Sequence, residues 1–193
     1  MISFIIPSIG RPTILNTITS LLNQTNNDWK CLIGFDGIKQ EELNLELPKD
    51  DRISYFYIDK KLGQIHHKHN HAGKVRNYLM SKVETDWIGF VDDDDTLETK
   101  YIEWFNNEKS NNNFDCLLFK MKFADKPNII PPYGCSSLIE GQVGISFVVN
   151  RNFIQNKIEF INYVSEDYVF LKEIEKHNGI IQFSNHIAYK VGF

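Results

Sequence analysis

The sequence has few of the features that would indicate a secreted, zinc-binding or membrane-spanning protein. Its 193 residues include three cysteines, Cys31, Cys116 and Cys135, and no Cys-x-x-Cys pair. Neither a disulfide framework nor a zinc knuckle is indicated, and a reducing compartment fits best. No segment approaches the roughly 20 apolar residues of a membrane span, and the start, MISFIIPS, does not resemble a signal peptide. We expect a soluble, cytoplasmic protein.

An excess of positive charge is also missing. The 21 Lys and Arg residues are outnumbered by 25 Asp and Glu residues, which gives a formal net charge of -4. Such a chain has no general attraction to polyanions, so nucleic acid is not an expected partner. The composition is that of a globular protein with 42% hydrophobic residues, and the length suits one domain.

Short apolar runs alternate with amphipathic segments along most of the chain. Strands are expected at 2–7, 29–37, 52–58, 86–91, 116–123, 143–154 and 180–191, and helices at 11–24, 73–83, 97–109 and 165–179. This alternation predicts an α/β domain with a mostly parallel sheet flanked by helices. The Pro- and Gly-rich segment 126–142 is predicted to be an irregular surface loop.

The run WIGFVDDDDTLE (87–98) contains four consecutive aspartates behind an apolar strand. Neighbouring carboxylates repel, so something must offset the cost of placing Asp92 to Asp95 side by side. Ligands of open parallel sheets bind beyond the carboxyl ends of the strands, where a divalent cation would neutralise the run. The alternative is an acidic helix start, with Asp95 capping a helix that begins near Leu97. Spacing alone leaves both interpretations open.

Four separated motifs resemble the family 2 glycosyltransferases of the GT-A fold. They are SFIIPSIGRPTILNTITSLLNQT, LIGFDG, HAGKVRNYLMSKVETDWIGFVDDDD and SEDYVFLKEI, and their order and spacing extend the resemblance over nearly the whole chain. The resemblance implies one GT-A domain over 1–193 with a Rossmann-like, mostly parallel sheet. Residues 1–95 would form the nucleotide-sugar donor half, and 96–193 the acceptor and catalytic half.

The resemblance also assigns a donor site. Base and ribose of a nucleotide would lie over the first two strands, against Pro7, Ser8, Arg11 and Asp36. A carboxylate can accept the imide N–H of uracil, and Asp36 is expected to stand exposed in its Asp-Gly turn. An ordinary turn aspartate is the alternative.

The next two motifs would hold the diphosphate and a metal ion. Arg76 and Asn77 match the Arg-Asn pair of the family, and Gly73 would let the backbone approach the ligand. Arg76 could also pair with the aspartate run. Within that run Asp94 would be the direct metal ligand, and Asp92 would lie nearer the ribose or a metal-bound water. Asp93 is expected to belong to the donor site, and Asp95 either binds the metal through water or caps a helix.

Asp167 would be the base that deprotonates the acceptor hydroxyl, and Glu166 would support it or bind the acceptor. The alternative for both is the acidic first turn of a capped helix. His186 is the only candidate for a late histidine ligand of the metal, and Lys190 could serve the diphosphate instead. One or two of His66, His67, His69 and His71 would touch the sugar or diphosphate from a loop, unless they are surface residues without a role.

The sequence therefore predicts a metal-dependent, inverting glycosyltransferase that uses Mn2+ or Mg2+. Its partners would be a nucleotide sugar, expected to be a UDP-sugar, and a glycan, glycoprotein or glycolipid acceptor. A nucleotide-sugar binding module without catalysis is a second hypothesis. A nucleotidyltransferase is a weaker third one, because no glycine-rich basic loop follows the first strand.

Overall fold

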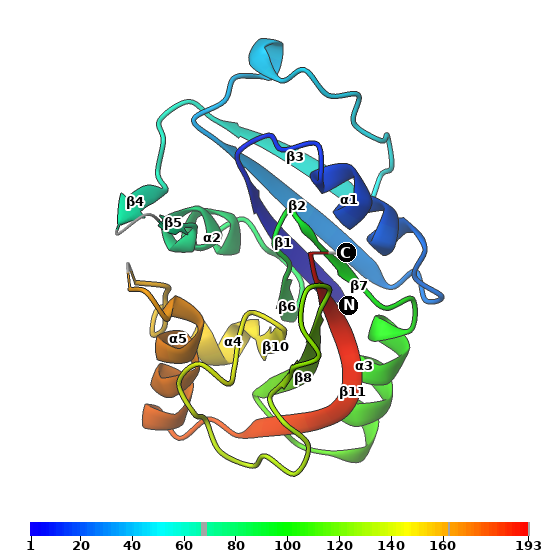
Figure 1. The fold of residues 1–193 in the computed structure, drawn as a ribbon, viewed down its shortest axis with the longest axis vertical. Coiled ribbons are helices and arrows are strands. Elements are labelled where there is room, and N and C mark those ends of the chain that lie inside the picture. Colours follow the sequence, from blue (N-terminus) through cyan, green and yellow to red (C-terminus); the bar gives the residue numbers. More distant parts are fainter. Residues whose placement is uncertain (67–68, 162, 193) are drawn as a thin grey trace.

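A β-sheet runs through the middle of the molecule and carries helices on both faces (Figure 1). The computed structural model describes residues 1–66, 69–161 and 163–192, and within it the side chains of 64–71 are not described. The strand order is β3-β2-β1-β6-β10-β8-β11-β7, with β9 paired to β8. None of the helices in these ranges is long and apolar enough to cross a membrane.

The first half of the sheet is wholly parallel, as predicted. It consists of β3 (Ile53–Ile58), β2 (Trp29–Asp36), β1 (Ile2–Ser8) and β6 (Trp87–Phe90). Every residue of β1 is buried, which explains why its sequence is a nearly continuous apolar run. The carboxyl ends of β1, β2 and β6 consequently meet at one edge.

The second half of the sheet is mixed. Strand β10 (Phe147–Asn150) runs antiparallel to β6 and to β8 (Cys116–Phe123). Strand β8 pairs in parallel with β11 (Ile181–Val191) and antiparallel with β9 (Ile129–Ile130). The last pair places β7 (Asp95–Leu97) antiparallel to β11, with Val191 opposite Asp95. The end of β11 therefore lies beside the aspartate run.

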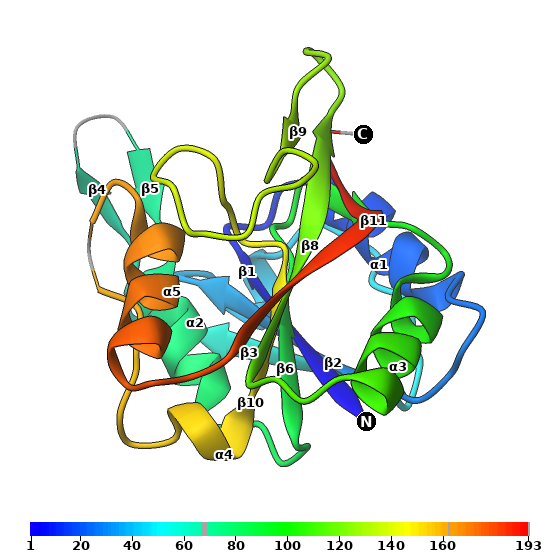
Figure 2. The same cartoon turned by 90° about the horizontal axis from the view of Figure 1, so that it is seen from below.

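Helices cover both faces of the sheet (Figure 2). One face carries α1 (Ile14–Leu22) and α3 (Tyr101–Asn111). The other carries α2 (Gly73–Met80), α4 (Arg151–Ile154) and α5 (Glu166–Lys176). Helices α2 and α5 begin near the edge where the parallel strands end, so both helix starts are available to a site there.

Four local predictions differ from the structure. Within the predicted irregular loop 126–142, residues 129–130 form β9 and pair with β8. The helix expected from 97 begins only at Tyr101, because residues 95–97 form β7 and pair with β11. The strand expected over 143–154 is confined to 147–150 and is followed by α4. The histidine segment, predicted to be a loop, forms the antiparallel strands β4 (Gln64–His66) and β5 (His69–His71). A single turn of 3-10 helix, η1 (Gln40–Glu42), interrupts the polar connection before β3.

A cluster of phenylalanine rings supports the start of α5. Phe160 stacks on Phe170 of α5 with 4.3 Å between ring centroids, and Phe90 of β6 packs edge-on against Phe160 at 5.2 Å. Phe147 of β10 also stacks on Phe170, with 5.5 Å between ring centroids. Buried aromatic pairs of this kind hold their elements firmly, so α5 is anchored to the central strands.

Candidate functional site

A cavity of about 330 Å3 opens at the carboxyl ends of β1, β2 and β6, beside the first turns of α2 and α5. It lies where open α/β sheets bind ligands. Nine of the side chains predicted from the sequence line it, and they come from all four motifs. They are Pro7, Ser8, Arg11, Asp36, Arg76, Asp92, Asp93, Glu166 and Asp167.

The four aspartates divide into two kinds. From residue 91 to 98 burial alternates with every residue, first through a turn at residues 93–94 that the Asp95 N–H closes on the Asp92 carbonyl at 3.2 Å, and then along strand β7. Asp93 and Asp95 are buried, at 2% and 4% exposure, whereas the side chains of Asp92 and Asp94 are 36% and 41% exposed. The apparent block of like charge is therefore two inward and two outward carboxylates.

Two arginines and the Ser8 hydroxyl offset the repulsion among Asp92, Asp93 and Asp94. Asp93 accepts hydrogen bonds from the hydroxyl of Ser8, at 2.6 Å, and from the guanidinium of Arg11. Arg11 also donates to Asp94 at 2.7 Å. Asp92 is paired with Arg76 at 2.5 Å. Two guanidinium groups thus contribute, within the protein itself, the compensation that the sequence assigned to a metal ion.

Asp95 has a structural position at the head of β7 and does not cap a helix. Its carboxylate accepts hydrogen bonds from the Tyr189 hydroxyl at 2.8 Å and from the Gly192 N–H at 2.9 Å. Burial, with a further contribution from the charge of Asp92, raises the pKa of Asp95 to about 7. The Tyr189 hydroxyl also accepts the N–H of Asp92 at 3.0 Å, so one tyrosine links the run to β11.

Arg76 lies beneath the cavity and joins α2 to the two acidic motifs. Its guanidinium donates to Glu166 and to Asp92, it is only 4% exposed, and it lies over the Phe160 ring at 5.2 Å. The structure bears out the pairing of Arg76 with the aspartate run that the sequence left open. A buried guanidinium in two ion pairs holds both carboxylates in place, since leaving either charge unpaired would be costly.

Asp167 is the carboxylate with the most unusual environment in the cavity wall. Burial raises its pKa to about 7, although Arg76 acts in the opposite direction and the charges of Asp92 and Glu166 add to the effect of burial. Its Oδ1 is buried without a hydrogen-bond partner, as are Oε2 of Glu166 and Nε of Arg76. Unpartnered buried polar atoms are rare in native proteins, and here three lie on neighbouring residues that line one cavity.

Asp36 lines the cavity, but the expectation that it stands exposed is wrong. It is 5% exposed, and its two carboxylate oxygens accept the backbone N–H groups of Leu62 at 2.6 Å and Gly63 at 2.8 Å. The carboxylate thereby holds the loop after β3 against the end of β2. Each oxygen retains a second lone pair, so Asp36 can still accept a hydrogen bond from a ligand.

Gly73 and Asn77 serve contacts within the protein. A Cβ atom on Gly73 would lie 2.8 Å from Oε2 of Glu166 and 2.9 Å from Cβ of Phe160, so glycine lets α2 approach the start of α5. The Asn77 amide donates to the Phe160 carbonyl and accepts the Phe160 N–H, both at 2.8 Å. The structure does not bring Asn77 to the cavity that the other predicted residues line.

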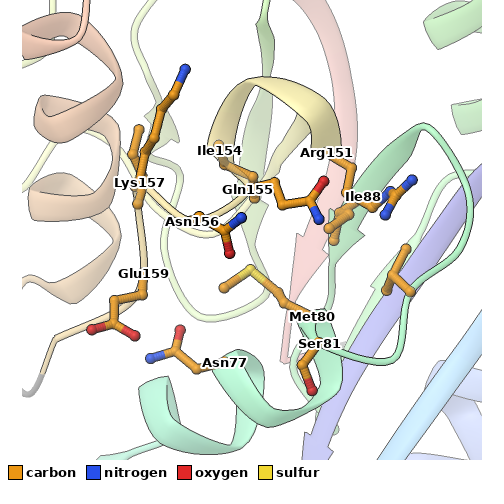
Figure 3. A pocket seen from close by; sticks show the side chains of 12 residues that line it. Asn77, Met80, Ser81, Ile88, Arg151, Ile154, Gln155, Asn156, Lys157 and Glu159 are labelled. Carbon is orange, nitrogen blue, oxygen red and sulfur yellow. The ribbon is translucent and has the colours of Figure 1, made fainter.

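Asn77 instead borders a second cavity of about 560 Å3, between the last turn of α2 and the segment after α4 (Figure 3). Met80 and Ser81 of the α2 end and Gln155 and Asn156 after α4 form much of its lining. None of the other predicted site residues lies there. The larger cavity is therefore separate from the acidic cluster.

The structure does not bring His186 to the aspartates. Its ring stacks on Trp104 of α3 with 4.5 Å between centroids and 4° between planes. His186 lies five residues before Val191, the partner of Asp95, which is about 16 Å along a strand. His186 is therefore not supported as a metal ligand. Lys190 is paired with Glu98 at 3.0 Å. Of the four clustered histidines, His67 lies outside the described residues, and only the backbone of His66, His69 and His71 is described.

Within the part of the chain whose side chains are described, no group of three His, Cys, Asp or Glu residues is placed to hold a metal ion. Two partly exposed carboxylates, Asp92 and Asp94, stand two positions apart in the run. Asp92 lines the cavity, whereas Asp94 is not among its lining residues and is joined to it through Arg11. Mg2+ is commonly bound by only one or two carboxylates, with phosphate oxygens and water completing the shell. The residues present fit that type of site and do not fit an all-protein metal cage.

Sequence reasoning missed Tyr189. A tyrosine in a terminal strand carries no local signal, and its contact with the aspartates depends on β11 pairing with β7. It also missed Ile9 and Val164, which line the cavity and are 44% and 62% exposed. Both are apolar residues close in sequence to Ser8 or Glu166. That position indicates a place in the cavity wall only when the structure shows that the two motifs line the same cavity.

Comparison with known proteins gives a family and a fold. The sequence model described as Glycosyl transferase family 2 matches residues 3–128. A protein named as uncharacterized glycosyltransferase EpsJ, from Bacillus subtilis (strain 168), is 27% identical over 136 residues, which is 68% of this chain and 38% of that protein.

Crystal structures of S. aureus TarS 1–349 superpose on nearly the whole chain. One of them has a TM-score of 0.72 at 16% identity, and the match covers 98% of this chain and 60% of that one. The complexes with UDP and with UDP-GlcNAc give TM-scores of 0.69 and 0.72. At this identity the likeness shows a shared GT-A fold. The chain spans less than two thirds of the length of each of these relatives.

The raised pKa of Asp95 predicts a pH-dependent stability. Between its unfolded pKa near 3.8 and its folded pKa of about 7, the folded protein binds more protons than the unfolded chain, so stability falls as pH rises. From pH 6 to pH 8 this carboxyl should remove about 1.4 kcal/mol from the free energy of unfolding. Asp95→Asn should abolish that part of the decline, measured by urea denaturation in EDTA. Asp51→Asn, in an exposed turn, is the control, and an unaltered decline in Asp95→Asn would contradict the assignment.

The role of Asn77 predicts a loss of stability on truncation. Asn77→Ala leaves the N–H and carbonyl of Phe160 without their partner and should cost about 2 kcal/mol in the free energy of unfolding. Ser81→Ala, which removes only a bond to the Tyr78 carbonyl within the same segment, should cost much less. Chemical denaturation of both variants measures the difference in the free energy of unfolding. Equal stabilities would show that the two hydrogen bonds between Asn77 and the Phe160 backbone do not stabilise the fold.

Proposed function

The chain belongs to glycosyl transferase family 2, and on that premise we propose that it is a metal-dependent, inverting glycosyltransferase that transfers a sugar from a UDP-sugar to a hydroxyl acceptor. The observation that carries the proposal is the convergence of four separated motifs on one cavity. A carboxylate with a pKa near 7, the partly exposed Asp92 and two arginines border the same space.

The donor is assigned from the chemistry of the cavity and from the related structures. TarS, which shares the fold, has been crystallised with UDP and with UDP-GlcNAc. In this chain Asp36 retains lone pairs that can accept the imide N–H of uracil, and Ser8 and Arg11 offer donors for ribose or phosphate oxygens. We therefore take UDP as the first nucleotide to test.

Asp94 and Asp92 are the side chains that would hold Mn2+ or Mg2+, together with the oxygens of the diphosphate. When bound, the metal ion supplies positive charge against the negative charge that develops on the leaving diphosphate. Asp93 and Asp95 support this loop from below through Ser8, Arg11 and Tyr189.

Asp167 acts as the general base in a single displacement. The acceptor oxygen forms its bond to the anomeric carbon while the bond from that carbon to the diphosphate oxygen breaks and the electron pair leaves with the diphosphate. The proton of the acceptor hydroxyl goes to Asp167, and one displacement inverts the anomeric configuration. A base with a pKa near 7 combines adequate basicity with a large ionised fraction at neutral pH.

Glu166 is a positioning residue in this mechanism. One of its oxygens is fixed by Arg76, and the other lies against Gly73. Because Arg76 also holds Asp92, the base at the start of α5 and the loop that would hold the metal keep a constant relation. We propose that residues 1–95 form the donor half of one domain and residues 96–193 its acceptor and catalytic half. Asp167 belongs to the acceptor and catalytic half.

The role of Asp167 predicts a specific loss of turnover. Asp167→Asn keeps the size of the side chain but removes the base, so transfer should fall by at least about 100-fold while UDP affinity in the presence of Mn2+ stays unchanged. Sugar transfer is assayed with a panel of UDP-sugars and hydroxyl acceptors, and UDP binding by calorimetry. Asp125→Asn, an exposed residue after β8, is the matched control. Wild-type transfer rates in Asp167→Asn would overturn the proposal.

Ionisation of Asp167 predicts the acid limb of the pH profile. Since the carboxyl must be deprotonated to accept the hydroxyl proton, kcat/KM should fall about tenfold per pH unit below pH 7. A profile flat from pH 5 to pH 8 would contradict this role. UDP binding without turnover against any acceptor would instead indicate a binding module, and pyrophosphate release from a nucleoside triphosphate would indicate a nucleotidyltransferase.

A further inference from the structure

Arg11 and Arg76 neutralise the same aspartate run in different ways. Arg76 is 4% exposed, is paired with two carboxylates and packs on an aromatic ring, so its guanidinium has no room to leave. Arg11 lies on the loop between β1 and α1, and 44% of its side chain is exposed. Arg76 is therefore a fixed part of the fold, whereas the guanidinium of Arg11 is exposed enough to leave Asp94 for another partner.

The partner of Arg11 is the residue proposed to bind the metal ion. One guanidinium nitrogen donates to Asp94 at 2.7 Å, and another donates to the buried Asp93. A divalent cation that reaches Asp94 while Arg11 remains there meets a like charge within a few ångströms, because both cations use the same carboxylate. Arg11, which bridges Asp93 and Asp94, therefore lowers the affinity of Asp94 for a metal ion that arrives alone.

A diphosphate offers Arg11 a second position. Arg11 and Ser8 line the same cavity as the aspartates, and a planar guanidinium binds phosphate oxygens as well as it binds carboxylates. When a nucleotide diphosphate enters, Arg11 can transfer its hydrogen bond from Asp94 to the phosphate. Asp94 is then released at the moment when phosphate oxygens become available to complete the metal shell.

We infer that Arg11 couples metal binding to nucleotide binding, because it occupies Asp94 until a diphosphate takes its place. This inference rests on the proposed function. It predicts that Mn2+ binds weakly to the protein alone and tightly in the presence of UDP, and that UDP affinity is raised by Mn2+ to the same extent. The coupling belongs to Arg11 specifically, since Arg76 keeps its pairs in both states.

The test measures Mn2+ affinity by electron paramagnetic resonance of the free ion, without UDP and with saturating UDP. For the wild-type protein UDP should tighten Mn2+ binding by roughly tenfold or more. In Arg11→Gln, Mn2+ alone should bind roughly tenfold more tightly than in the wild-type protein. The further gain from UDP should be smaller than in the wild-type protein by a similar factor, and the remaining gain comes from the phosphate oxygens that complete the metal shell. Arg11→Lys, which keeps the charge without the two-pronged contact, should lie between them.

Two controls separate this effect from general changes of charge or folding. Arg52→Gln removes an arginine paired with Asp50 outside the cavity lining, so it changes the net charge equally and should leave Mn2+ binding as in the wild-type protein. Thermal unfolding of each variant verifies that it is folded before the titration, and Arg11→Lys serves if Arg11→Gln is not.

The outcomes distinguish the inference from the proposed function. If UDP binds with Mn2+ but Arg11→Gln and the wild-type protein have equal Mn2+ affinities without UDP, the inference is overturned and the proposed function stands. If the wild-type protein binds no UDP with Mn2+ present, both are overturned. If Arg52→Gln and Arg11→Gln change the Mn2+ affinity equally, the change in net charge explains the effect, and the inference is also overturned.

Discussion

The two ion pairs of Arg76 are the interaction on which the rest of the site depends. One guanidinium, buried under the cavity, holds Glu166 of α5 and Asp92 behind β6, two residues 74 positions apart in the chain. A buried cation of this kind is stable only when its counter-charges are in place. The start of α5 and the aspartate run therefore have to be assembled together, and any chemistry that needs both can rely on their relative position.

The packing around Arg76 shows how the fold prepares this arrangement. Gly73 has no side chain, so α2 can approach Glu166 closely. One helical turn later, Asn77 forms two hydrogen bonds with the backbone of Phe160. Phe160 in turn lies under the guanidinium and stacks on Phe170 of α5. The Gly-x-x-Arg-Asn motif is thus a structural unit that joins α2 to the start of α5 and to the aspartate run.

A second constraint is the pairing of β11 with β7. It brings Tyr189 to the aspartate run, where its hydroxyl accepts the N–H of Asp92 and donates to Asp95. The parallel half of the sheet, through β1 and β6, presents Ser8 and Arg11 from the other side. The acidic loop is consequently held from two sides of the fold, and its two outward carboxylates, Asp92 and Asp94, are left partly exposed.

The sequence by itself determined the α/β class, most strands and helices, and nine of the residues that line the cavity, because periodicity and motif order are local properties of the chain. Only the tertiary structure decided which side chains face the cavity. Asp95 is buried because residues 95–97 pair with β11, a contact between residues about 95 positions apart, and Asp93 is held inward by Ser8 and Arg11. The same long-range packing turned Asn77 toward Phe160 and left His186 against Trp104. Motifs specify which groups are available, but side-chain direction depends on strand register and helix contacts that no local pattern contains.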